Sequence, residues 1–228
     1  KRSRMPLLKR SGDGILWRGN ERFDPWAFAW VKADPPAELT AIGAREGLRL
    51  VMSGHPVRRI PVGVIGPREP NARQLDVAYE VGQALGTLGV QMACGGKGGV
   101  MEAACKGNLE AGGQPLGLLP DEEWTGANPY VAIPVATGIG AARNAILARA
   151  CTALIAVGGG YGTLSEMAYG LQWERLVLAL EGAPDVPGAV TCSDADAAID
   201  RLVPHLLGLD TNDPQTDNEQ DGRRSLTS

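Results

Sequence analysis

The chain has 228 residues, of which 44% are hydrophobic and 21% charged, as is typical of a globular protein with one sizeable domain plus extensions. Its net charge of -4 argues against a general affinity for nucleic acid, and no apolar run approaches the length needed to span a membrane. The four cysteines are scattered without metal-ligand spacing, and the two histidines stand outside any motif. This composition argues against a metal site or a Ser-His-Asp hydrolase and predicts a cytoplasmic protein with reduced thiols.

The first segment, residues 1–58, has a different pattern from the rest of the chain. It contains three tryptophans, several prolines and one predicted helix over 37–50. We expect an N-terminal extension whose tryptophans pack on the following domain or on a partner subunit. Two alternatives for its role are that it covers a binding pocket or that it forms a subunit contact.

From residue 60 onward, strands alternate with helices. The predicted strands are 60–65, 90–93, 116–119, 131–134, 152–157 and 176–180, and the predicted helices are 72–88, 100–111, 141–150, 163–173 and 194–207. This alternation predicts an α/β domain over 59–209 whose parallel sheet is covered by helices on both faces. The polar tail 210–228 cannot bury enough apolar surface to order itself and is predicted to be mobile.

Three glycine turns follow strands, where parallel sheets bind their ligands. The most informative turn runs from Gly158 to Glu166 (GGGYGTLSE). Glycines let the backbone approach a ligand closely, and the free N–H groups and the positive dipole end of the following helix favour a phosphate. The candidate phosphate-binding residues in this turn are Gly158, Gly159, Gly160, Tyr161, Gly162 and Thr163. Glu166 either faces the same pocket or completes a Thr-x-x-Glu capping box with Thr163.

The other two turns are Gly66 and the loop Gly95-Gly96-Lys97-Gly98-Gly99. The second is not a Walker loop, because Met101 and Glu102 stand where such a loop needs Lys followed by Ser or Thr. It is either a tight strand-to-helix turn or a second backbone cradle in which Lys97 supplies a charge to a phosphate. The candidate binding residues here are Gly66, Gly95, Gly96, Lys97, Gly98, Gly99, Met101 and Glu102.

Arg143 and Asn144 follow a further glycine-rich segment at the start of a predicted helix. An arginine opposes the helix dipole at this position, which indicates another purpose. It could hold a phosphate or carboxylate through a bidentate fork, or it could form a structural ion pair with an acid on a neighbouring loop.

Together these motifs resemble the LOG ("Lonely Guy") superfamily, which includes molybdenum cofactor carrier proteins and members with an old lysine decarboxylase label. The resemblance covers residues from about 60 to 207 and rests on GGKGGVME (95–102), AGG (111–113), GLLP (117–120), Arg143-Asn144 and GGGYGTLSE (158–166). It implies a Rossmann-like, doubly wound fold and a homodimer or larger homo-oligomer. The family's essential arginine and glutamate correspond to Arg143 and Glu166.

The resemblance leaves two functions open. The first is a nucleoside 5'-monophosphate phosphoribohydrolase, which cleaves the N-glycosidic bond to release free base and ribose 5-phosphate and needs no cofactor. The second is a non-catalytic carrier of a molybdopterin-type cofactor or a nucleotide. The phosphoribohydrolases have proline at the position of Gly158 and usually lysine at the position of Asn144, so these two residues bring the chain closer to the carriers. Either function predicts a phosphate-bearing small molecule as the partner, without nucleic acid or membrane.

Overall fold

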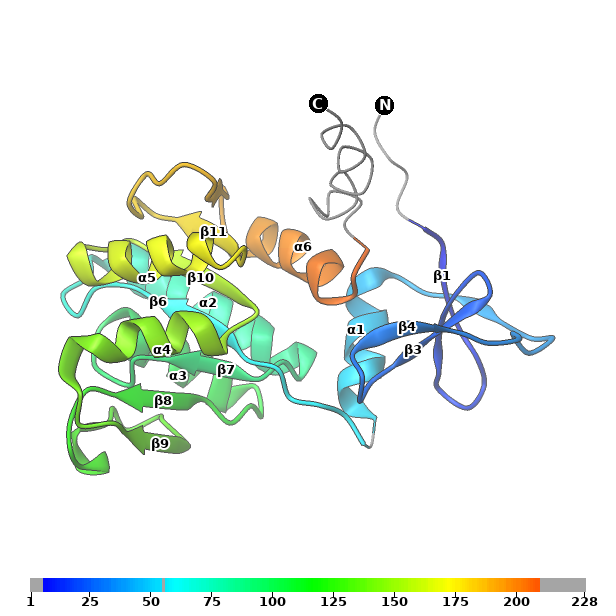
Figure 1. Ribbon diagram of the computed structural model, residues 1–228, viewed down its shortest axis with the longest axis horizontal. Coiled ribbons are helices and arrows are strands. Elements are labelled where there is room, and N and C mark those ends of the chain that lie inside the picture. Colours follow the sequence, from blue (N-terminus) through cyan, green and yellow to red (C-terminus); the bar gives the residue numbers. More distant parts are fainter. Residues whose placement is uncertain (1–5, 55, 210–228) are drawn as a thin grey trace, which may run out of the picture.

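The structure is a computed structural model that describes residues 6–54 and 56–209 (Figure 1). The predicted mobile tail, 210–228, lies outside the described residues. The described chain forms a seven-stranded parallel sheet with flanking helices and a separate five-stranded antiparallel sheet built from its first part. None of the described helices has both the length and the apolar character that crossing a lipid bilayer requires.

The parallel sheet has the strand order β12-β11-β10-β6-β7-β8-β9. Its strands are β6 (Val62–Ile65), β7 (Met92–Cys94), β8 (Leu116–Leu119), β9 (Ile133–Ala136), β10 (Ala153–Val157), β11 (Leu176–Leu180) and β12 (Val190–Thr191). The helices that follow or connect them are α2 (Ala72–Leu88), α3 (Val100–Glu110), α4 (Arg143–Ala150), α5 (Tyr161–Gln172) and α6 (Ala195–Leu206), with short 3-10 turns at η1 (Trp124–Gly126) and η2 (Gly140–Ala142). The predicted doubly wound Rossmann-like fold is therefore confirmed.

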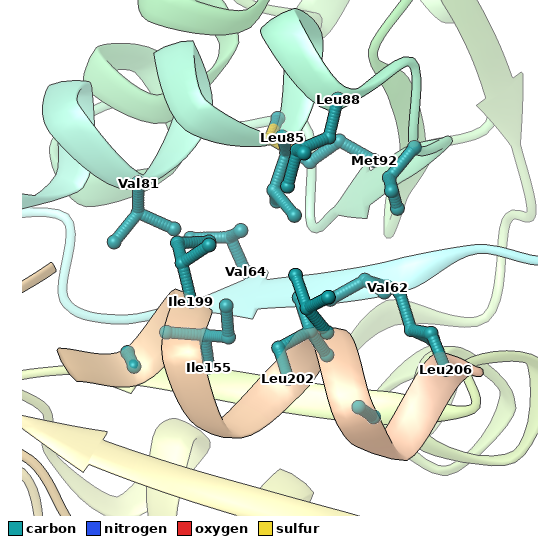
Figure 2. Packing of buried hydrophobic residues seen from close by; sticks show 14 of the residues in the cluster. Val62, Val64, Val81, Leu85, Leu88, Met92, Ile155, Ile199, Leu202 and Leu206 are labelled. Carbon is teal, nitrogen blue, oxygen red and sulfur yellow. The ribbon is translucent and has the colours of Figure 1, made fainter. Parts of the chain in front are cut away.

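Helices cover both faces of this sheet because every central strand is apolar on both sides. In β10, Ala153, Ile155 and Val157 join the core beneath α2, α3 and α6, whereas Leu154 and Ala156 join the core beneath α4 and α5. Figure 2 shows the first of these cores, in which Ile199 and Leu202 of α6 lie against the sheet beside side chains of α2. Burial on both faces explains why these strands are continuous apolar runs in the sequence.

The α2–α3 pair is held close by glycines. A Cβ placed on Gly82 would lie 2.0 Å from the carbonyl oxygen of Ala104, and one on Gly107 would lie 2.2 Å from that of Tyr79. Backbone therefore meets backbone between these helices. The apolar stripe predicted on α2 is buried except for Leu75 near its start, which is 38% exposed.

The first part of the chain forms a sheet that the sequence did not predict. Its antiparallel order is β4-β3-β2-β1-β5, from strands β1 (Leu8–Arg10), β2 (Leu16–Arg18), β3 (Glu21–Asp24), β4 (Ala29–Lys32) and β5 (Thr40–Ala41). The helix predicted over 37–50 is α1 (Ala44–Ser53), which begins seven residues later because Gly43 is its N-cap. The strands are only two to four residues long and carry too little alternation to be recognised.

This N-terminal sheet packs against the end of the parallel domain where the strands begin (Figure 1). The Trp30 indole donates a hydrogen bond of 2.6 Å to the carbonyl oxygen of Leu207, just after α6. The Arg45 guanidinium on α1 forms ion pairs of 2.7 Å with Asp196 and 2.8 Å with Asp200. Since ligands bind where the strands end, the alternative that this extension covers the binding pocket is wrong.

Candidate active site

A cleft of about 320 Å³ opens at the carboxyl ends of β6, β8 and β10. It is lined by Ile65, Gly66, Pro67, Arg68, Met101, Pro120, Ala141, Arg143, Asn144, Gly160, Gly162, Thr163 and Glu166. The side of the sheet is the one that the topology predicts, since the loops after parallel strands converge there. Eight of these thirteen residues, from Gly66 to Glu166, are among the candidates that the sequence predicted.

The start of α5 supplies an uncapped helix end in the wall of this cleft. Its N-cap is Gly160, in an extended conformation and without a side chain to satisfy the first N–H groups of the helix. Gly162 and Thr163 in the first turn line the cleft. Free N–H groups and the positive end of the helix dipole at this position suit a phosphate group.

The capping-box alternative for Glu166 is wrong. The helix begins at Tyr161 rather than at Thr163, so Thr163 lies inside the first turn and does not cap it. The side chain of Tyr161 is 92% exposed and points away from the core, so that only its backbone belongs to the turn.

Gly158 and Gly159 shape the turn that leads into α5. Gly158 has a φ of +59°, and a Cβ there would lie 2.2 Å from the side-chain nitrogen of Gln74. Gly159 has a φ of +149°, and a Cβ there would lie 2.6 Å from Thr163. These positions need glycine for conformation and space, and neither of them lines the cleft.

Glu166 and Arg143 form the ion pair at the centre of the cleft. Nη1 of Arg143, at the start of α4, donates a hydrogen bond of 2.9 Å to Oε1 of Glu166 on α5. Each residue is only 6% exposed, although both line the cleft. The sequence left open an acid on a neighbouring loop as the partner of Arg143. The structure shows instead that the partner acid, Glu166, lies on a helix in the cleft.

Burial raises the pKa of the Glu166 carboxyl to about 7, although the charge and hydrogen bond of Arg143 act in the opposite direction. The carboxyl therefore changes its charge near neutral pH. A carboxyl group with a raised pKa in a cleft is a common feature of active sites.

The loop after β7 approaches Arg143 closely and fixes the second terminal nitrogen of its guanidinium group. Nη2 donates a weak hydrogen bond of 3.4 Å to the carbonyl oxygen of Gly95. A Cβ on Gly95 would lie 2.2 Å from the same nitrogen, so any larger residue there would displace the guanidinium. The buried Nε of Arg143 has no hydrogen-bond partner among the described residues.

Asn144 connects the two helices that carry this pair. Its amide nitrogen donates hydrogen bonds of 3.1 Å to Oγ of Ser165 and 3.4 Å to the carbonyl oxygen of Gly162. These hydrogen bonds hold the start of α4 against the first turn of α5. Asn144 also lines the cleft.

The structure places Lys97 away from the cleft. Its Nζ forms an ion pair of 2.8 Å with Asp121 and donates a hydrogen bond of 2.7 Å to the carbonyl oxygen of Gly126. The lysine holds the loop after β8, and its charge is already neutralised. The predicted role of Lys97 as a charge for the phosphate therefore lacks support from its position.

The other residues of the 95–102 motif have two roles: some shape the turn, and others line the cleft or a neighbouring cavity. Gly96 has a φ of +71°, and a Cβ there would lie 2.5 Å from Leu119. Gly98 lies in the same turn, where a Cβ would lie 3.5 Å from the Glu102 carboxylate. Gly99 and Glu102 line a second cavity next to the cleft, and Met101 lines the cleft itself.

Three residues that were not among the predicted site residues shape this region. Arg68 and Pro120 line the cleft after β6 and β8. Asn128 is buried and donates a hydrogen bond of 3.0 Å to the carbonyl oxygen of Lys97, which holds the glycine loop in place. Arg68 directly follows the glycine turn at Gly66, a position that could have drawn attention to it.

Residues 59–202 match the SLOG cluster4 family. The chain belongs to this family. The resemblance to the LOG and molybdenum cofactor carrier-like superfamily is therefore confirmed. The SLOG match begins just after α1, so it excludes the N-terminal sheet.

Two solved structures resemble this chain over nearly their whole length. The Moco carrier protein of Chlamydomonas reinhardtii is 34% identical with a TM-score of 0.61, and the match covers 67% of this chain and 100% of that protein. The molybdenum cofactor binding protein of Rippkaea orientalis is 31% identical with a TM-score of 0.60, covering 64% of this chain and 96% of that protein. The cytokinin riboside 5'-monophosphate phosphoribohydrolase LOG5 of Arabidopsis thaliana is 36% identical over 106 residues, covering 44% of this chain and 46% of LOG5.

Proposed function

We propose that this SLOG protein hydrolyses the N-glycosidic bond of a nucleoside 5'-monophosphate, releasing the free base and ribose 5-phosphate. The observation that carries this proposal is the buried Arg143–Glu166 pair, which lines a cleft beside the uncapped start of α5. A phosphate site and a buried carboxyl group within one cleft match the two ends of a nucleotide's ribose. The similarity of part of the chain to LOG5 supports the same chemistry.

Each part of the cleft has a role in this proposal. The first turn of α5 binds the 5'-phosphate through backbone N–H groups. The ionised carboxylate of Glu166 stabilises the positive charge that develops on the ribose as the bond to the base breaks, and it orients the ribose hydroxyls and the attacking water. Arg143 holds Glu166 in position and clamps the substrate in the cleft that both residues line, which assists departure of the base.

The test is base release from nucleoside 5'-monophosphates, followed by chromatography, with wild-type protein and the Glu166→Gln variant. We expect Glu166→Gln to lower kcat by about 10²–10³-fold, because a preorganised charge is lost while the shape of the side chain is kept. Binding of AMP, measured by calorimetry, should remain. Glu80→Gln on the exposed part of α2 is the matched control and should leave turnover unchanged. Equal turnover by wild type and Glu166→Gln would exclude this mechanism.

A second candidate function is carriage of a molybdopterin-type cofactor. It is favoured by the similarity to two molybdenum cofactor proteins over 96% and 100% of their lengths. Among the described residues that line the cleft, sulfur occurs only in the thioether of Met101. The cleft therefore offers no thiolate to the metal of such a cargo, and its phosphate site would hold the phosphate. Retention of a pterin fluorophore through purification, without base release from any nucleotide, would favour this function.

We also propose that the protein is a homo-oligomer through the outer faces of α4 and α5. These helices carry several large apolar side chains that are exposed in the single chain: Ile146, Tyr161, Leu164 and Tyr169. Light scattering should give at least twice the mass of one chain. An Ile146→Asp variant should shift the mass towards the monomer, and an unchanged mass would argue for a different interface.

A further inference from the structure

The cleft has a neighbour that the proposed hydrolysis does not use. A second cavity, of about 440 Å³, is lined by Arg68, Pro70, Leu75, Gly99, Glu102, Ala103, Lys106 and Tyr130. Arg68 lines both cavities, so they adjoin at this residue. Ligand pockets span about 300–1,000 Å³, and each cavity alone lies towards the low end of that range.

Among the described residues, three charged side chains around this second cavity form no ion pair, although the charge of Arg68 also acts on Asp121. Glu102 and Lys106 have the i,i+4 spacing that favours an ion pair on a helix, yet the ion pairs of the described residues do not include one between them. Arg68 is exposed and has neither an ion pair nor a hydrogen bond from its side chain within the described part of the chain. Their charges are therefore free to meet a ligand.

The remaining walls suit an aromatic ring. Tyr130 is half-buried against the core, and its backbone N–H donates a hydrogen bond of 3.1 Å to the side chain of Asn128. Leu75 is exposed towards solvent at 38%, although it lies near the start of an otherwise well-packed helix. An exposed leucine and a fixed tyrosine on one cavity provide the apolar and stacking surface that a heterocyclic base needs.

The two cavities also share one backbone scaffold. The N–H of Val100, at the start of α3, donates a hydrogen bond of 3.1 Å to the carbonyl oxygen of Pro67. A Cβ on Gly99 would lie 2.5 Å from the carbonyl oxygens of Pro67 and Arg68, so this glycine permits the contact. The Pro67–Arg68 segment is thus fixed between the cavities, and a ligand that spans both would pass beside Arg68.

We propose that, besides a nucleoside 5'-monophosphate in the cleft, the protein binds a pyrophosphate-linked dinucleotide whose second nucleoside occupies the second cavity. Arg68 contacts the pyrophosphate where the cavities meet, and Lys106 adds a second positive charge. The Glu102 carboxylate accepts hydrogen bonds from the hydroxyls of the second ribose, and the base lies against Tyr130 and Leu75. This inference rests on the proposed function, since the first nucleotide occupies the cleft of Arg143 and Glu166.

Calorimetry with AMP, ADP and diadenosine pyrophosphate tests the two cavities separately. AMP reports on the cleft, ADP on the additional phosphate and the dinucleotide on the second nucleoside. We expect diadenosine pyrophosphate to bind at least about tenfold more tightly than AMP, with ADP between them. Lys106→Ala and Glu102→Gln should each reduce this advantage and leave the affinity for AMP unchanged. Lys32→Ala, an exposed lysine on β4 of the N-terminal sheet, is the matched control and should change neither affinity.

The outcomes separate the two proposals. Equal affinities for AMP and the dinucleotide, or an advantage that persists in both variants, would overturn the second subsite while AMP binding still supports the cleft. Failure of all three ligands to bind would overturn the nucleotide function and this inference together. Thermal denaturation of each variant shows whether a lost advantage reflects unfolding, and the exposed position of Lys106 makes Lys106→Ala the variant least disturbing to the fold.

Discussion

At the scale of single residues, the charge of Glu166 controls the cleft. Hydrolysis as proposed requires the ionised carboxylate, and burial raises the pKa of this group to about 7. We therefore expect the hydrolysis rate to fall as the pH drops through 7, by about tenfold per unit once the carboxyl is mostly protonated. A pH profile of kcat/KM checks this. Because a nucleotide phosphate has a second pKa of about 6, AMP binding by Glu166→Gln over the same range separates the two titrations.

The same pKa gives a stability prediction of defined sign. The folded protein holds a proton on Glu166 between the ordinary pKa of 4.5 and about 7, whereas the unfolded chain does not. Stability from this group is therefore greatest at acidic pH and is lost as the pH rises through 7. Relative to Glu166→Gln, the wild type should lose on the order of 1–3 kcal/mol of unfolding free energy between pH 5 and pH 8. Urea denaturation at the two pH values measures it, and parallel pH dependences in the two proteins would contradict it.

Arg143 and Glu166 also show what the sequence could predict at this scale. Their residue types and positions beside glycine turns indicated a shared pocket, and the structure joins them by a direct hydrogen bond. The position of Lys97 could not be inferred, because its partner Asp121 belongs to a loop after another strand. Packing between loops decides whether Lys97 or Arg143 faces a ligand. The spacing of these residues in the sequence carries no signal for it.

At the scale of secondary structure, close packing of α2 on α3 depends on Gly82. A Gly82→Ala change places a Cβ 2.0 Å from the carbonyl oxygen of Ala104, so the helices must separate. We expect the free energy of unfolding to fall by about 1–3 kcal/mol, even though alanine has a higher helix propensity than glycine. Gly47→Ala in α1 is the control, since its nearest neighbour is a methyl group of Leu16 at 3.0 Å that can rotate away. Urea denaturation compares the two, and equal losses would contradict the backbone contact.

Prediction of the elements succeeded where burial on both faces left a long apolar run. The bounds of α2, β8 and β11 agree with those predicted, because each of these segments is bounded by turn residues or a cap such as Asn71. The start of α5 was predicted two residues too late, because Thr163 appeared to be a cap while the extended Gly160 ends the preceding turn. The edge strand β12, with two residues, is too short to give a pattern.

At the scale of the whole molecule, the candidate active site belongs to the parallel sheet, and the N-terminal sheet lies apart from it. The cleft lies where the parallel strands end, and the N-terminal sheet lies where they begin (Figure 1). The SLOG family match covers only the parallel domain, and the N-terminal sheet lies outside it. Contacts such as the Arg18 hydrogen bond of 3.2 Å to the carbonyl oxygen of Gly208 connect the two parts. Changes at this junction should therefore affect stability without affecting the reaction.

The Trp30 indole provides the test of this separation. Trp30→Phe removes its hydrogen bond to Leu207 and keeps an aromatic ring beside Phe23, whose centroid lies 5.2 Å away. We expect a loss of about 1 kcal/mol of unfolding free energy and unchanged kcat/KM for nucleotide hydrolysis. Arg45→Ala should cost less than about 1 kcal/mol, because its ion pairs with Asp196 and Asp200 are largely exposed. A fall in kcat/KM in folded Trp30→Phe protein would show instead that the N-terminal sheet is coupled to the cleft through α6 and the strands.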